Sequence, residues 1–448
     1  MHQIKQIPPT PKFSKIAILG WGKEGQALYQ YFQSQSTQID IYDQKLAKSI
    51  IEKLAKANPN CQISFYDHFD LQGSYDQVFK SPGISFHKIN SGGKPIDPST
   101  FQLNSLINLL FERMDRNRII AITGTKGKST TASLIHHILT TNNHKSQLLG
   151  NIGNINLELL DNTDPQTWYV FEVSSFQAEF LKYSPRYAVF TSFYQDHQDV
   201  HSTMKEYLNA KLNLIKHQRH NDLAIFSPQF AESIGIDIGL IRTPYTVAGI
   251  RNIFESQLIG INNQVNCQLA NLICQRLGTE TQQIISAIAK YQPLKGRIES
   301  IGKFQSIEFF ADDLATIPEA TWSAIESLNG TKSNKLATLI VGGYDKGLDY
   351  TQLAKQLTTT KVQNFIYFNP TGQAIVKDLD KSKVNVVQVN NMQEAVEQAY
   401  QLTAKNKICL LSCASASFGL FDNAYDRGEQ YRQYVKDQGS KNDLKTID

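Results

Sequence analysis

The chain has 448 residues, 41% of them hydrophobic and 19% charged, and its 45 Lys and Arg against 41 Asp and Glu give a formal net charge of +4. This hydrophobic content is enough to bury the cores of two or three domains, which excludes a chain that is disordered throughout. The mild charge excludes the strongly basic surfaces of proteins that bind nucleic acid or membranes, so we expect neither as a partner.

Three segments combine a short, β-branched apolar run with a glycine-rich turn and an amphipathic stretch. The runs are KIAILG from Lys15 to Gly20, RIIAIT from Arg118 to Thr123, and KLATLIV from Lys335 to Val341. Helices are predicted after them, over Gln26–Gln33, over Thr130–Thr140 and from about Tyr350. Such alternation is typical of α/β domains with mainly parallel sheets.

Two interruptions of these patterns indicate domain boundaries. The loop-like stretch Asn90–Thr100 places one near Asn104, and the Pro- and Gly-containing stretch Tyr291–Phe304 places another near Ser300. We therefore predict three domains, 1–104, 105–300 and 301–448. The outer two are expected to be Rossmann-like, and the central one, which carries the second glycine turn, to be of the P-loop ATPase type.

The first glycine turn, GWGKEG (Gly20–Gly25), follows a strand, and Asp43 ends the next strand. Together they form a partial dinucleotide fingerprint, in which glycines let a helix begin close to a bound phosphate. Alone, this pattern would also fit a nicotinamide-dependent oxidoreductase. That alternative leaves the second glycine turn without a purpose.

The second turn, GTKGKST (Gly124–Thr130), lies between a strand and a helix. Its glycines let backbone N–H groups face a phosphate, and the helix N-terminus adds partial positive charge. Lys128 is expected to reach the β- and γ-phosphates of ATP, and Ser129 or Thr130 to offer a hydroxyl to Mg²⁺. Ile122 stands where the strict nucleotide-binding pattern has glycine. We predict that the whole loop binds ATP, through Gly124, Thr125, Lys126, Gly127, Lys128, Ser129 and Thr130.

Further residues with chemical potential follow the next apolar strands. Glu172 lies near the end of one strand, where a carboxylate is costly unless it is paired or binds metal. The segment YQDHQDVH (Tyr194–His201) follows another strand and contains His197. Lys211 lies within a helical apolar pattern, where a lysine that extends to solvent is the ordinary interpretation. We expect His201 at the surface.

The short GTKGKS loop resembles the Mur ligase and folylpolyglutamate synthetase superfamily, and the segments after it resemble the Mur ligase central domain. The resemblance implies that Glu172 and His197 help the loop hydroxyls to hold Mg²⁺, and that Lys211 is carbamylated. A carbamate would be an anionic oxygen ligand, whereas an ammonium would repel the metal. With Lys128, these three are the predicted catalytic residues. The resemblance also implies substrate contacts of Asn151, Ser174 and Gln177, and ATP contacts of Asn266 and Arg297.

The outer domains resemble the glutamate-adding Mur ligases, whereas folylpolyglutamate synthetase lacks the leading domain. In the first domain the resemblance assigns a UDP-sugar site to Trp21, Gly22, Lys23, Asp43, Ser81 and Gly83. In the third domain the segments ADDLATIP, GGYDKG and LLSCASAS carry it. They imply that Asp312 binds the ATP ribose and that Thr316 and Lys346 bind the α-carboxylate of glutamate. Ser417 is expected to bind the side-chain carboxylate of glutamate.

The resemblance implies ATP-dependent ligation of glutamate to UDP-N-acetylmuramoyl-L-alanine through an acyl phosphate, with ATP and Mg²⁺ as cofactors, in peptidoglycan precursor synthesis. Three residues depart from the family pattern around the predicted glutamate and phosphate sites: Leu314 replaces lysine, Asp313 serine and Ala424 an aromatic residue. D-Glutamate is favoured because it is the commoner activity. An L-glutamate-adding branch and a catalytically idle nucleotide-binding homologue stay open as alternatives.

The five cysteines are scattered without a CxxC pair, as expected for free thiols in a reducing compartment. Residues 1–15 lack the apolar core of a signal peptide, and no apolar run is long enough to span a bilayer. We therefore expect a cytoplasmic protein, and a monomer.

Overall fold

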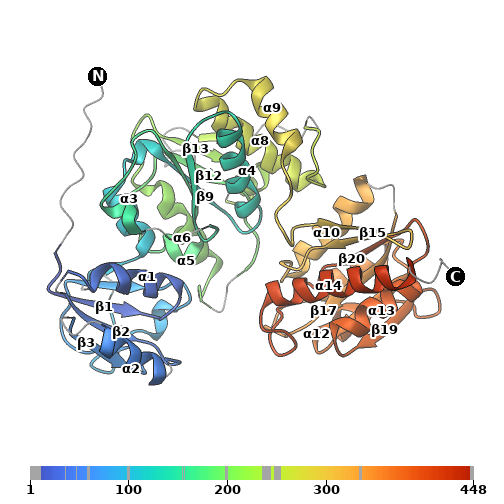
Figure 1. Cartoon of the computed structure of the whole chain (residues 1–448), viewed down its shortest axis with the longest axis horizontal. Helices are drawn as coiled ribbons and strands as arrows, with labels where there is room; N and C mark the ends of the chain where they lie inside the picture. The colour runs from blue at the N-terminus through green and yellow to red at the C-terminus, as the bar shows by residue number, and fades with distance from the viewer. Residues whose placement is uncertain are drawn as a thin grey trace. The chain divides into compact units, whose positions relative to one another are not determined.

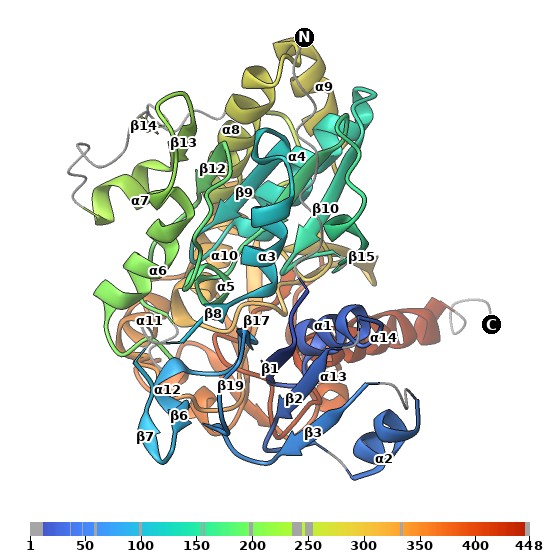
Figure 2. The same cartoon turned by 90° about the vertical axis from the view of Figure 1, so that its left-hand side faces the viewer.

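The computed structural model describes residues 12–443 except 36, 47, 58–60, 98–100, 154, 156, 197–199, 235–243, 247–253 and 332–334. The chain divides into two compact units (Figures 1 and 2): unit 1 comprises Met1–Ile250 and Val265–Ile288, and unit 2 comprises Arg251–Gln264 and Ala289–Asp448. Unit 1 contains two larger sheets and unit 2 a third, and almost every strand in them is parallel to its neighbours. The predicted α/β fold class is therefore confirmed. Among the described residues, no helix combines the length and apolar character that crossing a bilayer requires.

The first sheet of unit 1 has the strand order β3-β2-β1-β5-β8, and all of its strands are parallel. Its strands are β1 (Lys15–Leu19), β2 (Gln38–Tyr42), β3 (Ile63–Tyr66), β5 (Gln77–Lys80) and β8 (Leu103–Asn104). The accompanying elements are α1 (Lys23–Phe32), α2 (Lys48–Ala57), η1 (Phe86–Lys88) and a small sheet of β4 (Asp70–Leu71), β6 (Asn90–Ser91) and β7 (Lys94–Pro95).

Glycine lets α1 begin directly beside β1. A Cβ atom on Gly25 would lie 2.0 Å from the carbonyl oxygen of Gly20, and Gly20 has a φ of +93°. Only a glycine at position 25 allows this helix to pass so close to the strand end. The first glycine turn thus has a packing role as well as its predicted binding role.

The central sheet of unit 1 has the order β10-β11-β9-β12-β13-β14, again with all strands parallel. Its strands are β9 (Ile119–Thr123), β10 (Ser146–Gly150), β11 (Trp168–Glu172), β12 (Tyr187–Phe190), β13 (Leu223–Phe226) and β14 (Pro244–Thr246). Around it lie α3 (Leu106–Arg113), η2 (Arg116–Arg118), α4 (Lys128–Thr141), η3 (Leu157–Leu160), α5 (Ser175–Ala178), α6 (Met204–Lys216), α7 (Pro228–Ser233), α8 (Ile261–Arg276) and α9 (Thr281–Lys290).

β9 lies between β11 and β12, so the chain continues to one side of β9 and later to the other. Figure 2 shows β10 and β12 on opposite sides of β9. Its five residues are all buried, as expected for a strand that is covered on both faces. In an open parallel sheet, ligands bind beyond the carboxyl ends of the strands at such a reversal of strand order. The loop after β9 occupies this place.

The sheet of unit 2 has the order β15-β16-β20-β17-β18-β19, in which only β15 is antiparallel to its neighbour. The strands are β15 (Glu299–Phe304), β16 (Ile307–Ala311), β17 (Leu336–Gly342), β18 (Asn364–Phe368), β19 (Asn385–Val389) and β20 (Ile408–Leu411). One core packs the sheet against α10 (Pro318–Thr331), α11 (Thr351–Leu357) and α12 (Thr371–Val376). Another core packs the sheet against α13 (Met392–Leu402) and α14 (Ala424–Asp443).

Candidate active site

The loop Gly124–Thr130 joins β9 to the N-terminus of α4, as predicted. Gly124 and Gly127 have φ angles of +146° and +86°, and a Cβ atom on either would lie within 3 Å of a neighbouring atom. The Thr125 backbone N–H donates to the Ser192 carbonyl oxygen (2.7 Å), and the Lys126 backbone N–H donates to Ser192 Oγ (2.8 Å). The segment after β12 therefore holds the loop in one shape.

Lys128 and Asn266 also lie at this loop. Lys128 Nζ donates to the Thr125 carbonyl oxygen (3.0 Å), so the lysine folds over its own loop. Asn266 comes from α8, and its Oδ1 accepts a hydrogen bond from Thr131 Oγ1 (3.2 Å) on α4. The structure thus brings the predicted ATP residue Asn266 to the predicted phosphate loop, across more than a hundred residues of sequence.

Glu172 ends β11, the neighbour of β9, and its side chain is buried. Its Oε1 accepts a hydrogen bond from Asn151 Nδ2 (2.9 Å), while its Oε2 is buried and has no hydrogen-bond partner among the described residues. An unsatisfied buried carboxylate oxygen is costly, and a bound cation would remove that cost. Together with the hydroxyls of Ser129 and Thr130, this carboxylate is a donor set that suits Mg²⁺.

Lys211 is 1% exposed, so the interpretation of a lysine extending to solvent is wrong. Its Nζ donates to the Gly124 carbonyl oxygen (2.9 Å) and lies 4.2 Å from the ring centroid of Tyr207. Burial lowers the pKa of Lys211 well below its usual value, and the charge of Lys128 lowers it further, whereas Asp196 raises it. A low pKa favours the neutral amine, which is the form that can react with carbon dioxide to give a carbamate.

The predictions for two histidines in the segment after β12 stand differently. His197 lies outside the described residues, so its predicted metal ligation stays a prediction. His201, which we expect at the surface, is instead 3% exposed. Its Nε2 lies 3.0 Å from Ser175 Oγ, and its ring stacks on Phe176 at 5.2 Å. Sequence pattern alone missed this burial because the aromatic partner comes from α5.

Ser174 and Gln177 form a capping box at the start of α5. Ser174 Oγ accepts from the Gln177 backbone N–H (3.2 Å), and Gln177 Oε1 accepts from the Ser174 backbone N–H (2.9 Å). Gln177 Nε2 also donates to Glu24 Oε1 (2.6 Å), which joins α5 to α1 of the first sheet. Burial raises the pKa of Glu24 to about 7, although the hydrogen bond from Gln177 and the charge of Lys80 act in the opposite direction.

Glu24 is a residue that the sequence analysis missed. It lies inside the GWGKEG segment, in the first turn of α1, where an acidic residue is common. The motif pattern holds no signal for its burial.

Most of the predicted UDP-sugar residues gather at the carboxyl ends of β1, β2 and β5. Asp43 accepts a hydrogen bond from the Trp21 backbone N–H (2.7 Å), and Ser81 Oγ donates to the Gly20 carbonyl oxygen (3.0 Å). Gly22 and Lys23 begin α1, and they are exposed together with Gly83 and Asn151. The structure thus brings these residues together, while their binding of a UDP-sugar stays a prediction.

In unit 2 the predicted ATP and glutamate residues lie in loops after β16, β17 and β20, except for Arg297, which lies just before β15. Asp312 Oδ2 accepts a hydrogen bond from Ser412 Oγ (3.0 Å). The loop with the exposed Lys346 pairs with the loop of the buried Ser417 through a β-bridge between Tyr344 and Ala416. The remaining two residues, Thr316 and Arg297, are partly buried.

Asp313, one of the three departures, does not face a glutamate site. It is 1% exposed, and its Oδ1 pairs with Arg432 Nη2 (2.8 Å). The expectation that it lies around the incoming glutamate and the ATP phosphate is therefore wrong for its side chain, because the ion pair turns the carboxylate into the interior of unit 2. Leu314 and Ala424 are both partly exposed.

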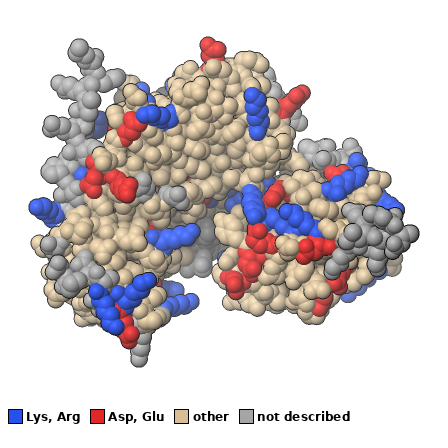
Figure 3. Space-filling model, viewed as in Figure 1, with Lys and Arg blue, Asp and Glu red and all other residues tan. Residues whose placement is uncertain are grey.

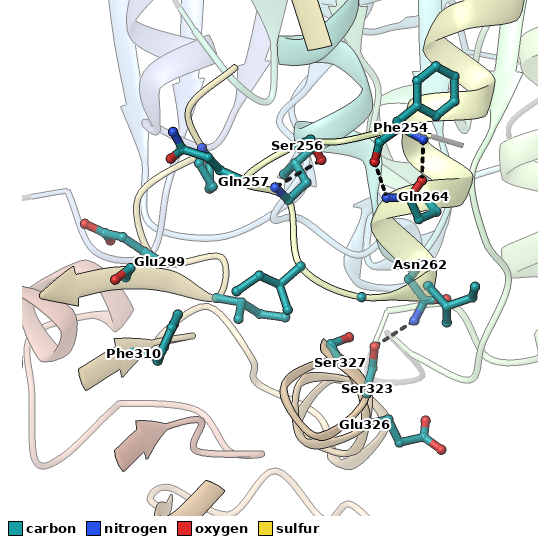
Figure 4. Close-up of a pocket in the computed structure, with 18 of the residues that line it drawn as sticks. Phe254, Ser256, Gln257, Asn262, Gln264, Glu299, Phe310, Ser323, Glu326 and Ser327 are labelled. Carbon is teal, nitrogen blue, oxygen red and sulfur yellow. Dashed lines mark hydrogen bonds between the residues drawn. The ribbon is translucent and has the colours of Figure 1, made fainter. Parts of the chain in front are cut away.

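A cavity of about 1010 Å³ lies elsewhere in unit 2, between the segment before α8, the start of β15 and α10 (Figure 4). Asn262 Nδ2 donates to Ser323 Oγ (2.6 Å) at its edge, and Phe254 and Gln264 exchange hydrogen bonds. None of the predicted site residues lines it. On the face drawn in Figure 3, positive and negative side chains are interspersed, in keeping with the mild net charge.

The model of the Mur ligase middle domain matches residues 122–232, and that of the Mur ligase glutamate ligase domain matches residues 296–415. A UDP-N-acetylmuramoylalanine–D-glutamate ligase of Lawsonia intracellularis is 28% identical over 94% of both chains. A UDP-N-acetylmuramoyl-L-alanine–L-glutamate ligase of a Micromonospora species is 33% identical over 94% of this chain and 96% of its own.

Solved structures agree in fold. The UDP-N-acetylmuramate-alanine ligase MurC of Thermotoga maritima has a TM-score of 0.59 at 16% identity and covers 95% of this chain and 99% of its own. MurF ligase of the same organism, solved in complex with ADP, has a TM-score of 0.59 at 15% identity, over 90% and 96%. With a 33% identical ligase matching along almost its whole length, this chain belongs to the Mur ligase family.

Proposed function

We propose that this Mur ligase uses ATP to join glutamate to UDP-N-acetylmuramoyl-L-alanine in peptidoglycan precursor synthesis. One observation carries the proposal: the glycine loop, the unsatisfied carboxylate of Glu172 and the buried Lys211 converge at one edge of the central sheet. That combination suits phosphoryl transfer, because it offers hydrogen-bond donors for phosphate oxygens and ligands for a metal ion at one place. The names of the relatives supply the acceptor and the amino acid.

In the first step, an oxygen of the terminal alanyl carboxylate attacks the γ-phosphorus of ATP, ADP leaves, and an acyl phosphate forms. Lys128 and the backbone N–H groups of its loop stabilise the charge on the transferred group. Mg²⁺ would neutralise phosphate charge, with Ser129 or Thr130 and Glu172 as ligands of one ion and His197 and carbamylated Lys211 near a second.

In the second step, the amine of glutamate attacks the acyl carbon and phosphate leaves. Thr316 and Lys346 bind the α-carboxylate, and Ser417 binds the side-chain carboxylate. The β-bridge between Tyr344 and Ala416 supports this assignment, because it holds the loops of Lys346 and Ser417 side by side. His197 is a second choice as proton acceptor, since metal ligation suits it better.

The proposal also assigns residues to the rest of ATP and to the UDP-sugar. Asn266, Arg297 and Asp312 bind the nucleoside and phosphates of ATP, and the residues at the carboxyl ends of β1, β2 and β5 bind the UDP-sugar. Each of the three larger sheets forms the core of one domain, and the domain boundaries lie near residues 104 and 300.

The enzyme acts as a monomer in the cytoplasm. Five buried free cysteines fit this reducing compartment.

D-Glutamate is the proposed amino acid, and L-glutamate is the second candidate. Two observations favour the second candidate: the Micromonospora relative that adds L-glutamate is 33% identical, and Leu314 removes a cation from the loop that carries Thr316. The D-glutamate ligase of Bacteroides fragilis is 31% identical over 81% of this chain, so identity alone does not separate the two.

Phosphate release tests the proposal directly. Purified protein is given Mg·ATP and UDP-N-acetylmuramoyl-L-alanine, with D-glutamate, L-glutamate or no amino acid. We expect release that depends on both the acceptor and D-glutamate. Faster release with L-glutamate would reassign the enantiomer, and no amino-acid-dependent release with either would refute the ligase.

A further inference from the structure

Arg427 on α14 is fully buried and joins two loops of unit 2. Its Nη2 donates to the carbonyl oxygen of Asp313 (2.7 Å), and its Nη1 donates to the carbonyl oxygen of Ser415 (3.0 Å). Asp313 precedes Thr316 in one loop, and Ser415 precedes Ser417 in the other. One rigid, planar guanidinium thus spans the loops that carry two of the proposed glutamate ligands.

The buried charge of Arg427 acts on the carboxylate of Asp313, which itself forms an ion pair with Arg432. Arg432 Nη2 lies 2.8 Å from Asp313 Oδ1 and 2.7 Å from Glu299 Oε2, and its Nη1 lies 3.4 Å from Glu429 Oε1. Burial raises the pKa of Asp313, while the charges of Arg432 and Arg427 lower it. Removal of one member would leave a buried charge without its partner, which is more costly than the absence of the whole network.

The network is also tightly packed. A Cβ atom on Gly428 would lie 2.3 Å from Asp313 Oδ2, and one on Gly296 would lie 2.6 Å from the same oxygen. Interiors packed this closely transmit a displacement instead of absorbing it. A shift of Arg427 is therefore expected to move the loops that it holds.

Ser415 also connects to a third loop, the one that carries Lys346, through hydrogen bonds. Ser415 Oγ lies 2.7 Å from Thr371 Oγ1 and 3.2 Å from the hydroxyl of Tyr350, and Thr371 Oγ1 accepts from the Gly343 backbone N–H (2.9 Å). By contrast, Asp312 has its own anchor in Ser412 Oγ (3.0 Å). The proposed glutamate ligands thus depend on the Arg427 contacts more than the proposed ribose ligand does.

We propose that Arg427 is a positioning residue that sets the separation of the loops of Thr316 and Ser417, and hence the length of the dicarboxylic amino acid that the site accepts. The length selection rests on the proposed function, whereas the fixing of the loops does not. A dicarboxylate held at both ends is discriminated by the spacing of its two binding groups, because a methylene more or less breaks one contact.

The test compares Arg427→Lys and Arg427→Ala with Val435→Ala. Val435 is also fully buried on α14 and packs in the apolar core, so its variant is a control for loss of stability alone. In the Arg427 variants we expect the KM for glutamate to rise tenfold or more, with the KM for ATP within twofold of wild type. The preference for glutamate over aspartate and 2-aminoadipate should fall at least fivefold. Equal rises in both KM values, as in a merely destabilised enzyme, would overturn length selection by Arg427.

Hydrogen exchange of the substrate-free proteins gives a second readout that needs no ligase activity. We expect faster amide exchange in residues 313–316 and 415–417 of both Arg427 variants, and wild-type exchange there in Val435→Ala. Unchanged exchange in both folded Arg427 variants would overturn the fixing of the loops. If the wild-type protein released no phosphate with any amino acid, both the proposed function and the length selection would be refuted. Hydrogen exchange would still decide whether Arg427 holds the loops.

Discussion

Lys211 and Glu24 are ionisable side chains buried in unit 1, and their pKa values are shifted in opposite directions. Burial lowers the pKa of the Lys211 ammonium and raises that of the Glu24 carboxyl group, because it disfavours the charged form of each. Lys211 lies against the phosphate loop, and Glu24 lies against Gln177, a proposed substrate contact. Each of these two residues is the subject of one prediction at the scale of single residues.

Lys211→Ala should lower the rate of phosphate release at least a hundredfold, because it removes the carbamate oxygen proposed to lie near a metal ion. Added short carboxylates such as acetate should restore part of the rate by filling the space left. Lys216→Ala is the control, since Lys216 is an exposed lysine at the end of the same helix. A Lys211→Ala enzyme as active as wild type would exclude carbamylation from the mechanism.

Glu24→Gln should change how stability depends on pH. The pKa of Glu24 is raised from 4.5 to about 7 in the folded protein, so the folded state binds more protons than the unfolded state between these values. Stability from this group is fully present below about pH 4.5 and is lost as pH rises through 7, by roughly 3 kcal/mol at most. Urea unfolding at pH 5 and pH 8 should show a smaller loss in the variant, and parallel losses would contradict the prediction.

At the scale of elements, many of the proposed site residues lie at the carboxyl ends of parallel strands or in the loops that follow them, and helices bring Lys211 and Asn266 to the same loop. The loop after β9 enters α4 beside the ends of β11 and β12, and the loops after β17 and β20 pair with each other. Parallel strands bring all of these loops to one edge of their sheet. Glycines then permit the close approach of loop and helix.

Gly25→Ala should destabilise the first sheet of unit 1. The added Cβ would lie 2.0 Å from the backbone oxygen of Gly20, so α1 must move away from β1, at a cost of about 1–3 kcal/mol or more. Gly22→Ala is the matched control, because nothing lies within 4 Å of a Cβ at that position. Urea unfolding of both variants measures the difference. Equal stability of the two variants would contradict the close packing of α1 on β1.

At the scale of the whole molecule, each compact unit has its own apolar cores, and the proposed phosphate-binding loop belongs to unit 1. Binding of a ligand to the folded state alone raises the free energy of unfolding in proportion to the logarithm of its concentration. The stability of the chain therefore reports on binding without any chemical step.

Mg·ATP at a hundred times its Kd should raise the free energy of unfolding by about 2.7 kcal/mol. Lys128→Ala should lose most of this increase together with phosphate release, because the lysine supplies charge to the phosphates. Scanning calorimetry with and without Mg·ATP makes the measurement, with Lys216→Ala as control. An equal shift in the Lys128→Ala protein would refute the phosphate-loop assignment.

The sequence by itself determined the α/β class, the strand–loop–helix around Lys128, and the strand-end position of Glu172, because these depend on local periodicity and on glycine spacing. The resemblance to the Mur ligases was likewise visible in short motifs. These features need only neighbours in the chain.

Only the tertiary structure decided which side chains are buried and what they contact. Pattern placed His201 and Lys211 near solvent and Asp313 beside the substrate, whereas all three are buried against partners far away in the sequence. Glu24 and Arg427 gained their roles in the same way, from α5 and from two distant loops. Desolvation and long-range hydrogen bonds depend on how separate segments pack, and no local pattern encodes that.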